Sequence, residues 1–277
     1  MSKVASRLLT FFVGVPLVLF IVFFDYMNHL PLHILLGIFA VIGSDEFYEM
    51  IAKDKKLFPK EFILILTAIL PYTTYAFILC GQSTEITPWI LVAEVTIMMA
   101  AEAFRAKTFE VSLQKLAYSF FIIFYCGFMM TFLSRMTNLP NSKYIISLFL
   151  IFVFMCDSAA WFFGVLFGKN NRGFVAASPN KSIVGFIGGI AGSIASGALF
   201  KFLMPQVLTC SYLNLAIIGL VTSVAAISGD LIESVFKRSC NVKDSGRLIP
   251  GRGGVLDSID SVLVAAPIFY IAYTFLF

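Results

Sequence analysis

Two aspartates near the C-terminus, Asp257 and Asp260, have the spacing of a metal-binding pair on a helix. Residues three apart share one helix face, and carboxylate oxygens are ligands that Mg²⁺ prefers. The segment before them, residues 234–254, mixes lysines and arginines with four glycines, at which the backbone can approach a ligand closely. Carboxylates, cations and accessible backbone N–H groups in one segment predict a site for a phosphate compound and a divalent cation.

A second charged group begins just before this segment, at Asp230, and overlaps its first residues. On a helix, residues three and four apart are neighbours, so one broad face would carry most of the polar side chains between positions 230 and 238. A solvent-exposed amphipathic extension of the helix is the alternative interpretation. The side chains on this face are Asp230, Glu233, Ser234, Lys237 and Arg238.

Asp157 lies within an otherwise apolar run. An ionisable group at membrane depth is costly and usually faces a cavity. The alternative is a hydrogen-bonded carboxyl that stabilises helix packing, and the following Gly164 and Gly168 form a G-x-x-x-G pattern that is a common packing device.

The loop Ser178-Pro179-Asn180-Lys181-Ser182 precedes another apolar run. Either Ser178 or Ser182 is suited to cap the next helix. A helix N-terminus beside Lys181 favours phosphate binding. Ordinary capping, with a lysine on the cytoplasmic side of a membrane, is the alternative.

The composition indicates what must hold these groups. Hydrophobic residues make up 59% of the 277 residues and charged residues 13%, whereas soluble domains carry about 25% charged residues. The mean hydropathy is +0.92. Too few charged side chains remain to cover a surface in water, so we expect one integral membrane domain over residues 1–277. It divides into N-terminal helical spans, residues 1–143, and catalytic spans with cytoplasmic loops, residues 144–277.

Apolar runs near the length of about 20 residues that crosses a bilayer recur along the chain. They must be helical, because a bilayer offers no partner to open backbone groups. The second run ends with Asp45, Glu46 and Glu49, where we expect it to emerge into water. The nine expected spans are 8–24, 30–51, 62–81, 88–101, 117–134, 144–168, 183–203, 211–229 and 257–277, with the fourth extending through Glu102 if it does not stop at Ala101.

The basic residues predict the orientation of these spans. With the N-terminus in the cytoplasm, all lysines and arginines except Arg135, Lys143 and Lys201 fall on the cytoplasmic side. Nine spans then place the C-terminus outside and the charged loops in the cytoplasm. Nucleic-acid binding is disfavoured, since no recognisable module accompanies the net charge of +4.

The cysteines and histidines offer little chemistry. None of the five cysteines belongs to a C-x-x-C pair, which predicts inert thiols rather than metal or redox sites. His29 and His33 stand four apart near a membrane edge without an evident third ligand, so interfacial side chains are expected rather than a zinc site.

Taken together, the polar residues resemble the motif of the phosphatidate cytidylyltransferases, the CDP-diacylglycerol synthases. The detailed likeness covers about residues 150–262 and includes Gly229-Asp230, Asp157 and the loop from Ser178 to Ser182. The positions that carry the C-terminal pattern are Ser234, Lys237, Arg238, Lys243, Asp244, Gly246, Pro250, Gly251, Gly253, Gly254, Asp257 and Asp260.

Three positions depart from the family pattern. Arg252 stands where the family has histidine, Ser258 where it has arginine, and Val184 where it usually has glutamate. Arg252 can supply the cation missing at position 258, but a guanidinium cannot exchange protons near neutral pH as histidine does.

The resemblance implies an all-α polytopic enzyme that converts CTP and phosphatidic acid to CDP-diacylglycerol and pyrophosphate. It implies Mg²⁺, with allowance for a second, monovalent or divalent, cation, and a homodimer. We expect it in the bacterial inner membrane with the active site facing the cytoplasm. The residues with expected roles are Asp230, Asp257, Asp260, Lys243 and Asp244 in catalysis; Lys181, Ser178, Ser182, Ser234, Lys237, Arg238, Arg252, Gly253 and Gly254 in substrate binding; and Asp157, Asp230, Asp257 and Asp260 in metal binding.

Three other functions remain open at this point. A related enzyme that uses CTP and a different lipid would share the same motifs. An inactive relative is suggested by the three departures from the family pattern. An ion-coupled transporter would use Asp157 and Asp230 as ion sites, but its polar residues belong near the bilayer midplane rather than at one surface.

Overall fold

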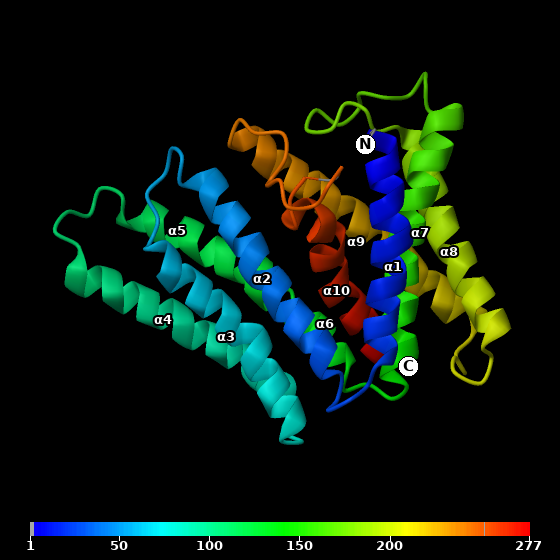
Figure 1. Ribbon diagram of the computed structural model, residues 1–277, viewed down its shortest axis with the longest axis horizontal. Coiled ribbons are helices and arrows are strands. Elements are labelled where there is room, and N and C mark those ends of the chain that lie inside the picture. The colour runs from blue at the N-terminus through cyan, green and yellow to red at the C-terminus, as the bar shows by residue number, and fades with distance from the viewer. Residues whose placement is uncertain (1–2, 252) are drawn as a thin grey trace. The chain divides into compact units, whose positions relative to one another are not determined.

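The computed structural model describes residues 3–251 and 253–277, with residues 3–12 described by their backbone alone. Arg252, a predicted substrate-binding residue, therefore lies outside the described residues. The elements in chain order (Figure 1) are α1 (Lys3–Phe23), α2 (Leu30–Ile51), α3 (Lys60–Leu79), η1 (Thr84–Ile86), α4 (Thr87–Arg105), α5 (Ser112–Ile122), η2 (Ile123–Phe128), α6 (Thr131–Met136), α7 (Ser142–Phe167), α8 (Ile183–Leu203), α9 (Tyr212–Ser239) and α10 (Leu256–Leu276).

The predicted all-α membrane architecture is confirmed. Eight helical segments in the described part of the chain are long and apolar enough to cross a bilayer. The first predicted span corresponds to α1, whose stretch from Val13 to Phe23 is apolar. The count of nine spans and the orientation of the termini stay predictions.

Three helical regions differ from the predicted runs. The fourth span continues past Glu102 to Arg105. The eighth, expected to end at 229, continues as α9 to Ser239 and so carries the charged face predicted for residues 230–238. The fifth contains a π-helical stretch, η2, where a Cβ on Gly127 would lie 3.1 Å from the backbone oxygen of Thr67 in α3. Glycine at this position allows η2 to pack directly against the α3 backbone.

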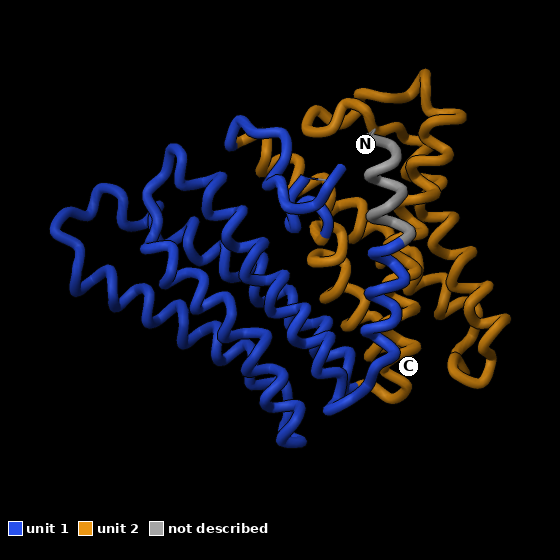
Figure 2. The backbone as a smooth tube through the Cα atoms, in the orientation of Figure 1, with its two compact units in different colours: residues 1–138, 240–258 blue, residues 139–239, 259–277 orange. Residues whose placement is uncertain are grey.

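The chain forms two compact units, shown in separate colours in Figure 2. Unit 1 comprises residues 1–138 and 240–258, and unit 2 comprises residues 139–239 and 259–277. The polar loop, defined here as residues 240–255 between α9 and α10, thus belongs to the same unit as the N-terminal helices.

Unit 1 contains α2, α3 and α4 in a row (Figure 1). Hydroxyl pairs join neighbouring helices: Ser44 Oγ lies 3.1 Å from Thr67 Oγ1, and Thr74 Oγ1 lies 3.1 Å from Thr87 Oγ1. These buried polar groups satisfy one another within otherwise apolar contacts. The large fully buried side chains of this unit include Phe47, Ile63, Leu70, Met98 and Ile122.

Unit 2 is built on the close packing of α7 against α8. A Cβ on Gly185 would lie 2.8 Å from the carbonyl oxygen of Ala160, and one on Gly189 would lie 2.9 Å from that of Cys156. The absence of side chains here lets the two helix backbones approach, as small residues do in membrane helix pairs. Gly164 also faces the start of α8, so the packing interpretation of the G-x-x-x-G pattern is supported.

Gly189→Ala should destabilise the protein by about 1–3 kcal/mol, because the added methyl group forces α7 and α8 apart. The readout is the thermal unfolding midpoint in detergent, which should fall. Gly14→Ala is the matched control, since a Cβ there meets nothing within 4 Å and should leave the midpoint unchanged or slightly raised. Equal midpoints for the two variants would contradict the packing argument.

Candidate functional site

Unit 2 contains a cluster of charged side chains from three helices, α7, α9 and α10, and from the loop before α8. Lys181, in the loop before α8, forms an ion pair with Asp230 of α9, and both side chains are partly exposed. One turn further along α9, Glu233 forms an ion pair with Lys237, and the Glu233 side chain is fully buried. Asp230, Glu233 and Lys237 therefore do share one face of α9, as their spacing predicted.

Asp260 of α10 belongs to the same cluster. It is only 8% exposed, and the carboxylates of Asp230, Glu233 and Asp157 lie close enough to act on it electrostatically. Its Oδ1 accepts a hydrogen bond from the backbone N–H of Ser261 at 2.6 Å. The close approach of α9 and α10 places Asp260 beside the acids of α9, since a Cβ on Gly229 would lie 2.6 Å from the carbonyl oxygen of Asp260.

The start of α8 is capped by the protein itself. Ser182 Oγ accepts a hydrogen bond from Gly185 N at 3.1 Å, which confirms the predicted capping. The N–H groups of Ile183 and Val184 donate to the backbone and side-chain oxygens of Asn171, at 3.3 and 3.5 Å. Because these donors have protein partners, the helix start offers fewer N–H groups to a phosphate than the sequence suggested.

The remaining predicted residues of unit 2 are less constrained. Ser178 lies in a turn, in which its carbonyl oxygen accepts a hydrogen bond from Lys181 N at 3.1 Å. Arg238 is exposed, and its Nε donates to the carbonyl of Ala177 at 3.4 Å. Ser234 is half-buried on α9.

In unit 1, Asp257 organises the polar loop. Its Oδ2 accepts hydrogen bonds from Ser245 N at 2.8 Å, Ser245 Oγ at 2.8 Å and Gly254 N at 2.7 Å. Gly253, with φ of +117°, exchanges two backbone hydrogen bonds with Ile249. The amides of Gly253 and Gly254, expected to face a ligand, thus bind groups of the loop itself.

The same loop receives a carboxylate from α2. Glu46 is 8% exposed, and its oxygens accept hydrogen bonds from Val255 N at 3.0 Å, Leu256 N at 2.9 Å and Ser245 Oγ at 3.1 Å. The expectation that Glu46 emerges into water is therefore wrong. Its neighbours Asp45 and Glu49 instead lie 2.6 Å from Lys60 Nζ at the start of α3.

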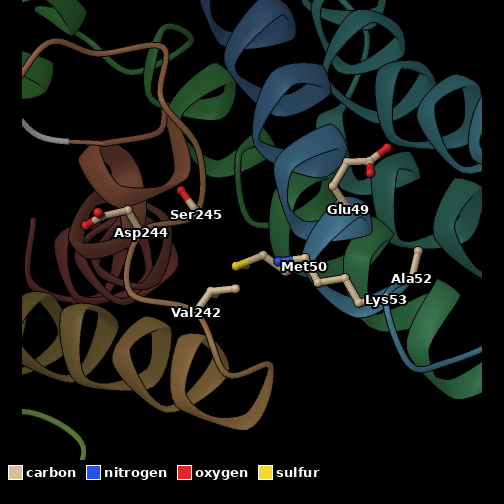
Figure 3. A pocket seen from close by; sticks show the side chains of 7 residues that line it. All are labelled: Glu49, Met50, Ala52, Lys53, Val242, Asp244 and Ser245. Carbon is tan, nitrogen blue, oxygen red and sulfur yellow. The ribbon is translucent and has the colours of Figure 1, made fainter.

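A cavity of about 250 Å³ lies between the end of α2 and the polar loop (Figure 3). Asp244, a predicted catalytic residue, lies at its wall, whereas Lys243 is an exposed loop residue. The cavity is lined by Glu49, Met50, Ala52, Lys53, Val242, Asp244 and Ser245.

Comparison with known proteins gives a family for this arrangement. Residues 5–276 match the cytidylyltransferase family. The chain belongs to this family. A phosphatidate cytidylyltransferase of Staphylococcus epidermidis is 41% identical over 145 residues, or 51% of this chain and 52% of that protein. One from Staphylococcus aureus is 36% identical over 191 residues, or 65% of this chain and 70% of that protein.

The resemblance read from the motifs is thereby confirmed, while the match covers only about half the length of the first of these relatives. The structure divides the polar residues singled out from the sequence between the two units. Lys181, Asp230 and Asp260, with Asp157 near enough to act on Asp260, belong to unit 2. Lys243 and Asp244 of the polar loop and Asp257 in the first turn of α10 belong to unit 1.

Glu46 is the buried acid that the sequence analysis did not predict. A signal was present: Glu46 lies three residues after Gly43 and four before Met50, and both of these are buried in α2. Helical spacing thus placed Glu46 on the apolar face. Its neighbouring acids, which do reach Lys60, obscured that pattern.

Asp257→Ala should loosen the polar loop, because three hydrogen bonds to one carboxylate oxygen are lost, each worth about 1.5–3 kcal/mol when the acceptor is charged. Trypsin cleavage after the exposed Lys243 and Arg247 should accelerate by about tenfold or more. Ser258→Ala is the control, since it removes a single 3.3 Å bond to the Gly254 carbonyl. Equal cleavage rates in both variants would refute the organising role of Asp257.

Proposed function

We propose that this chain catalyses the reaction of CTP with phosphatidic acid to give CDP-diacylglycerol and pyrophosphate. A phosphate oxygen of phosphatidic acid forms a bond to the α-phosphorus of CTP, and the bond from that phosphorus to the bridging oxygen of pyrophosphate breaks. The lipid supplies the nucleophile, so no covalent enzyme intermediate is needed. The observation that carries the proposal is the acidic and basic cluster of unit 2 in a chain of the cytidylyltransferase family.

The charges of that cluster fit a divalent cation. Four carboxylates, those of Asp157, Asp230, Glu233 and Asp260, stand beside the two ammonium groups of Lys181 and Lys237. Carboxylates withdrawn from water need cations or donors to remain charged. A bound Mg²⁺ would add positive charge to this group of carboxylates.

The spacing of the acids favours one kind of metal site. Within residues 3–251 and 253–277, no group of three or more His, Cys, Asp or Glu side chains is arranged to hold a metal by itself. Mg²⁺ usually keeps several waters and binds through one or two carboxylates together with substrate phosphates. We assign Asp230 and Asp260 to that role, with Asp157 nearby. The ion would neutralise charge on the triphosphate.

The basic residues complete the proposed site. Lys181 and Lys237 would contact phosphate oxygens from the two ends of the cluster, and the exposed Arg238 extends this basic surface. Catalysis would consist of positioning the two phosphates and neutralising their charge. Lys243 and Asp244 of the polar loop and Asp257 of α10 keep the roles assigned from the sequence as part of the proposal.

The site's orientation and assembly belong to the same proposal. The basic loops favour an active site facing the cytoplasm of a bacterial cell, where CTP is available. The homodimer implied by the family and a second bound cation are also included.

Purified protein should release pyrophosphate from CTP only when phosphatidic acid and Mg²⁺ are both present. Asp260→Asn should lower kcat at least about 100-fold, because the variant loses a buried charge that acts on the reacting phosphates. Thr274→Ala, at the far end of α10, is the control. Well-folded protein without lipid-dependent release from CTP would overturn the proposal, whereas release with a different lipid phosphate alone would identify another lipid as the substrate.

Chelation tests the metal assignment separately. EDTA should abolish the lipid-dependent release, and excess Mg²⁺ should restore it, because the proposed reaction uses a divalent cation to neutralise charge on the triphosphate. The measurement is the initial rate before and after chelation at constant ionic strength. Activity that persists at full rate in EDTA would contradict a metal-assisted reaction.

A further inference from the structure

We propose that Glu46 is a positioning residue that fixes the polar loop and the first turn of α10 to helix α2. This inference rests on the proposed function, because that function uses Asp244 of the loop and Asp257 in the first turn of α10. Glu46 itself contacts protein groups, and its effect on the reaction would pass through the loop.

The hydrogen bonds of Glu46 are those of a helix cap provided by a distant part of the chain. The first N–H groups of a helix have no partner within the helix. Those of Val255 and Leu256, at the start of α10, donate to the two oxygens of Glu46 at 3.0 and 2.9 Å. A carboxylate is favoured there by the helix dipole and by charge-assisted hydrogen bonds. With the carboxylate in place, this helix start is not available to a substrate phosphate.

The loop sequence is fitted to that carboxylate. A Cβ on Gly246 would collide with the Glu46 side chain, which supplies all three of its nearest atoms. Gly254 likewise lies against Oε2 of Glu46. The small residues at 246 and 254 therefore make room for Glu46, in addition to any freedom they give the backbone.

Ser245 connects Glu46 to the predicted catalytic aspartate. Its hydroxyl lies 3.1 Å from Oε2 of Glu46 and 2.8 Å from Oδ2 of Asp257, and its backbone N–H donates to the same Oδ2 at 2.8 Å. Asp257 is thereby held in one orientation by a loop that Glu46 anchors. Loss of the anchor should disorder Asp257 while leaving the membrane helices folded.

The first experiment compares Glu46→Gln with Glu110→Gln. The amide at position 46 keeps the size of the side chain but places an NH₂ group opposite one of the two backbone donors, so kcat should fall about 10- to 100-fold with little change in the KM for CTP. Glu110 is an exposed glutamate of the same unit that has no role in the proposed site, and its variant should keep wild-type kcat. A Glu46→Gln enzyme with wild-type kcat would overturn the proposal.

Hydrogen exchange tests the anchoring without relying on activity. In Glu46→Gln, the amides of Val255 and Leu256 should exchange at least about tenfold faster, while those of α7 and α8 should keep their rates. If the wild-type protein is inactive but the amides of Val255 and Leu256 exchange faster in Glu46→Gln than in wild type, the proposed function fails and the anchoring stands. Unchanged protection in Glu46→Gln would overturn the anchoring, whatever the activity.

A double-mutant cycle tests the contact that the glycine makes. Gly246→Ala should lower activity because its methyl group meets Glu46, and shortening that side chain by Glu46→Asp should relieve the collision. The double variant should therefore be more active than the product of the two single effects predicts. Strictly multiplicative losses would show that positions 46 and 246 do not act on each other.

Discussion

A carboxylate withdrawn from water must find hydrogen-bond donors or cations, and the polar parts of this protein satisfy that requirement in two ways. Glu46 in unit 1 finds donors, two backbone N–H groups and a hydroxyl. In unit 2, Asp230 and Glu233 find lysines, Lys181 and Lys237. Only 13% of the residues are charged, so the chain has few side chains that can pair with a buried carboxylate.

The two solutions have different consequences. Glu46 is fully engaged by protein groups, which suits an anchor that must not exchange partners. In the cluster around Asp260, the paired side chains of Lys181 and Asp230 are partly exposed, which suits a site where charged ligands come and go. The same side-chain chemistry thus supports a fixed contact in one unit and a proposed binding site in the other, and the supply of local partners makes the difference.

Much of the architecture was readable from the sequence because the bilayer leaves few choices. Apolar runs of bilayer length must be helical, and eight of the predicted runs are helices of that length within the described residues. The position of Ser182 before an apolar run predicted that it caps a helix. The spacing of the charged residues predicted that they share one face of α9. The π-helical stretch near Gly127 was not readable, because it depends on contact with Thr67 in another helix.

The sequence by itself determined the membrane architecture, the family and the polar residues that carry its motif, because hydrophobic length and motif spacing are local properties of the chain. Only the tertiary structure decided which of those residues bind each other. Asp257 and Asp260 stand three apart in the sequence, yet the first organises a loop and the second joins an acidic cluster. Glu46 lies about two hundred residues from its partners, and no local pattern encodes a hydrogen bond over such a separation.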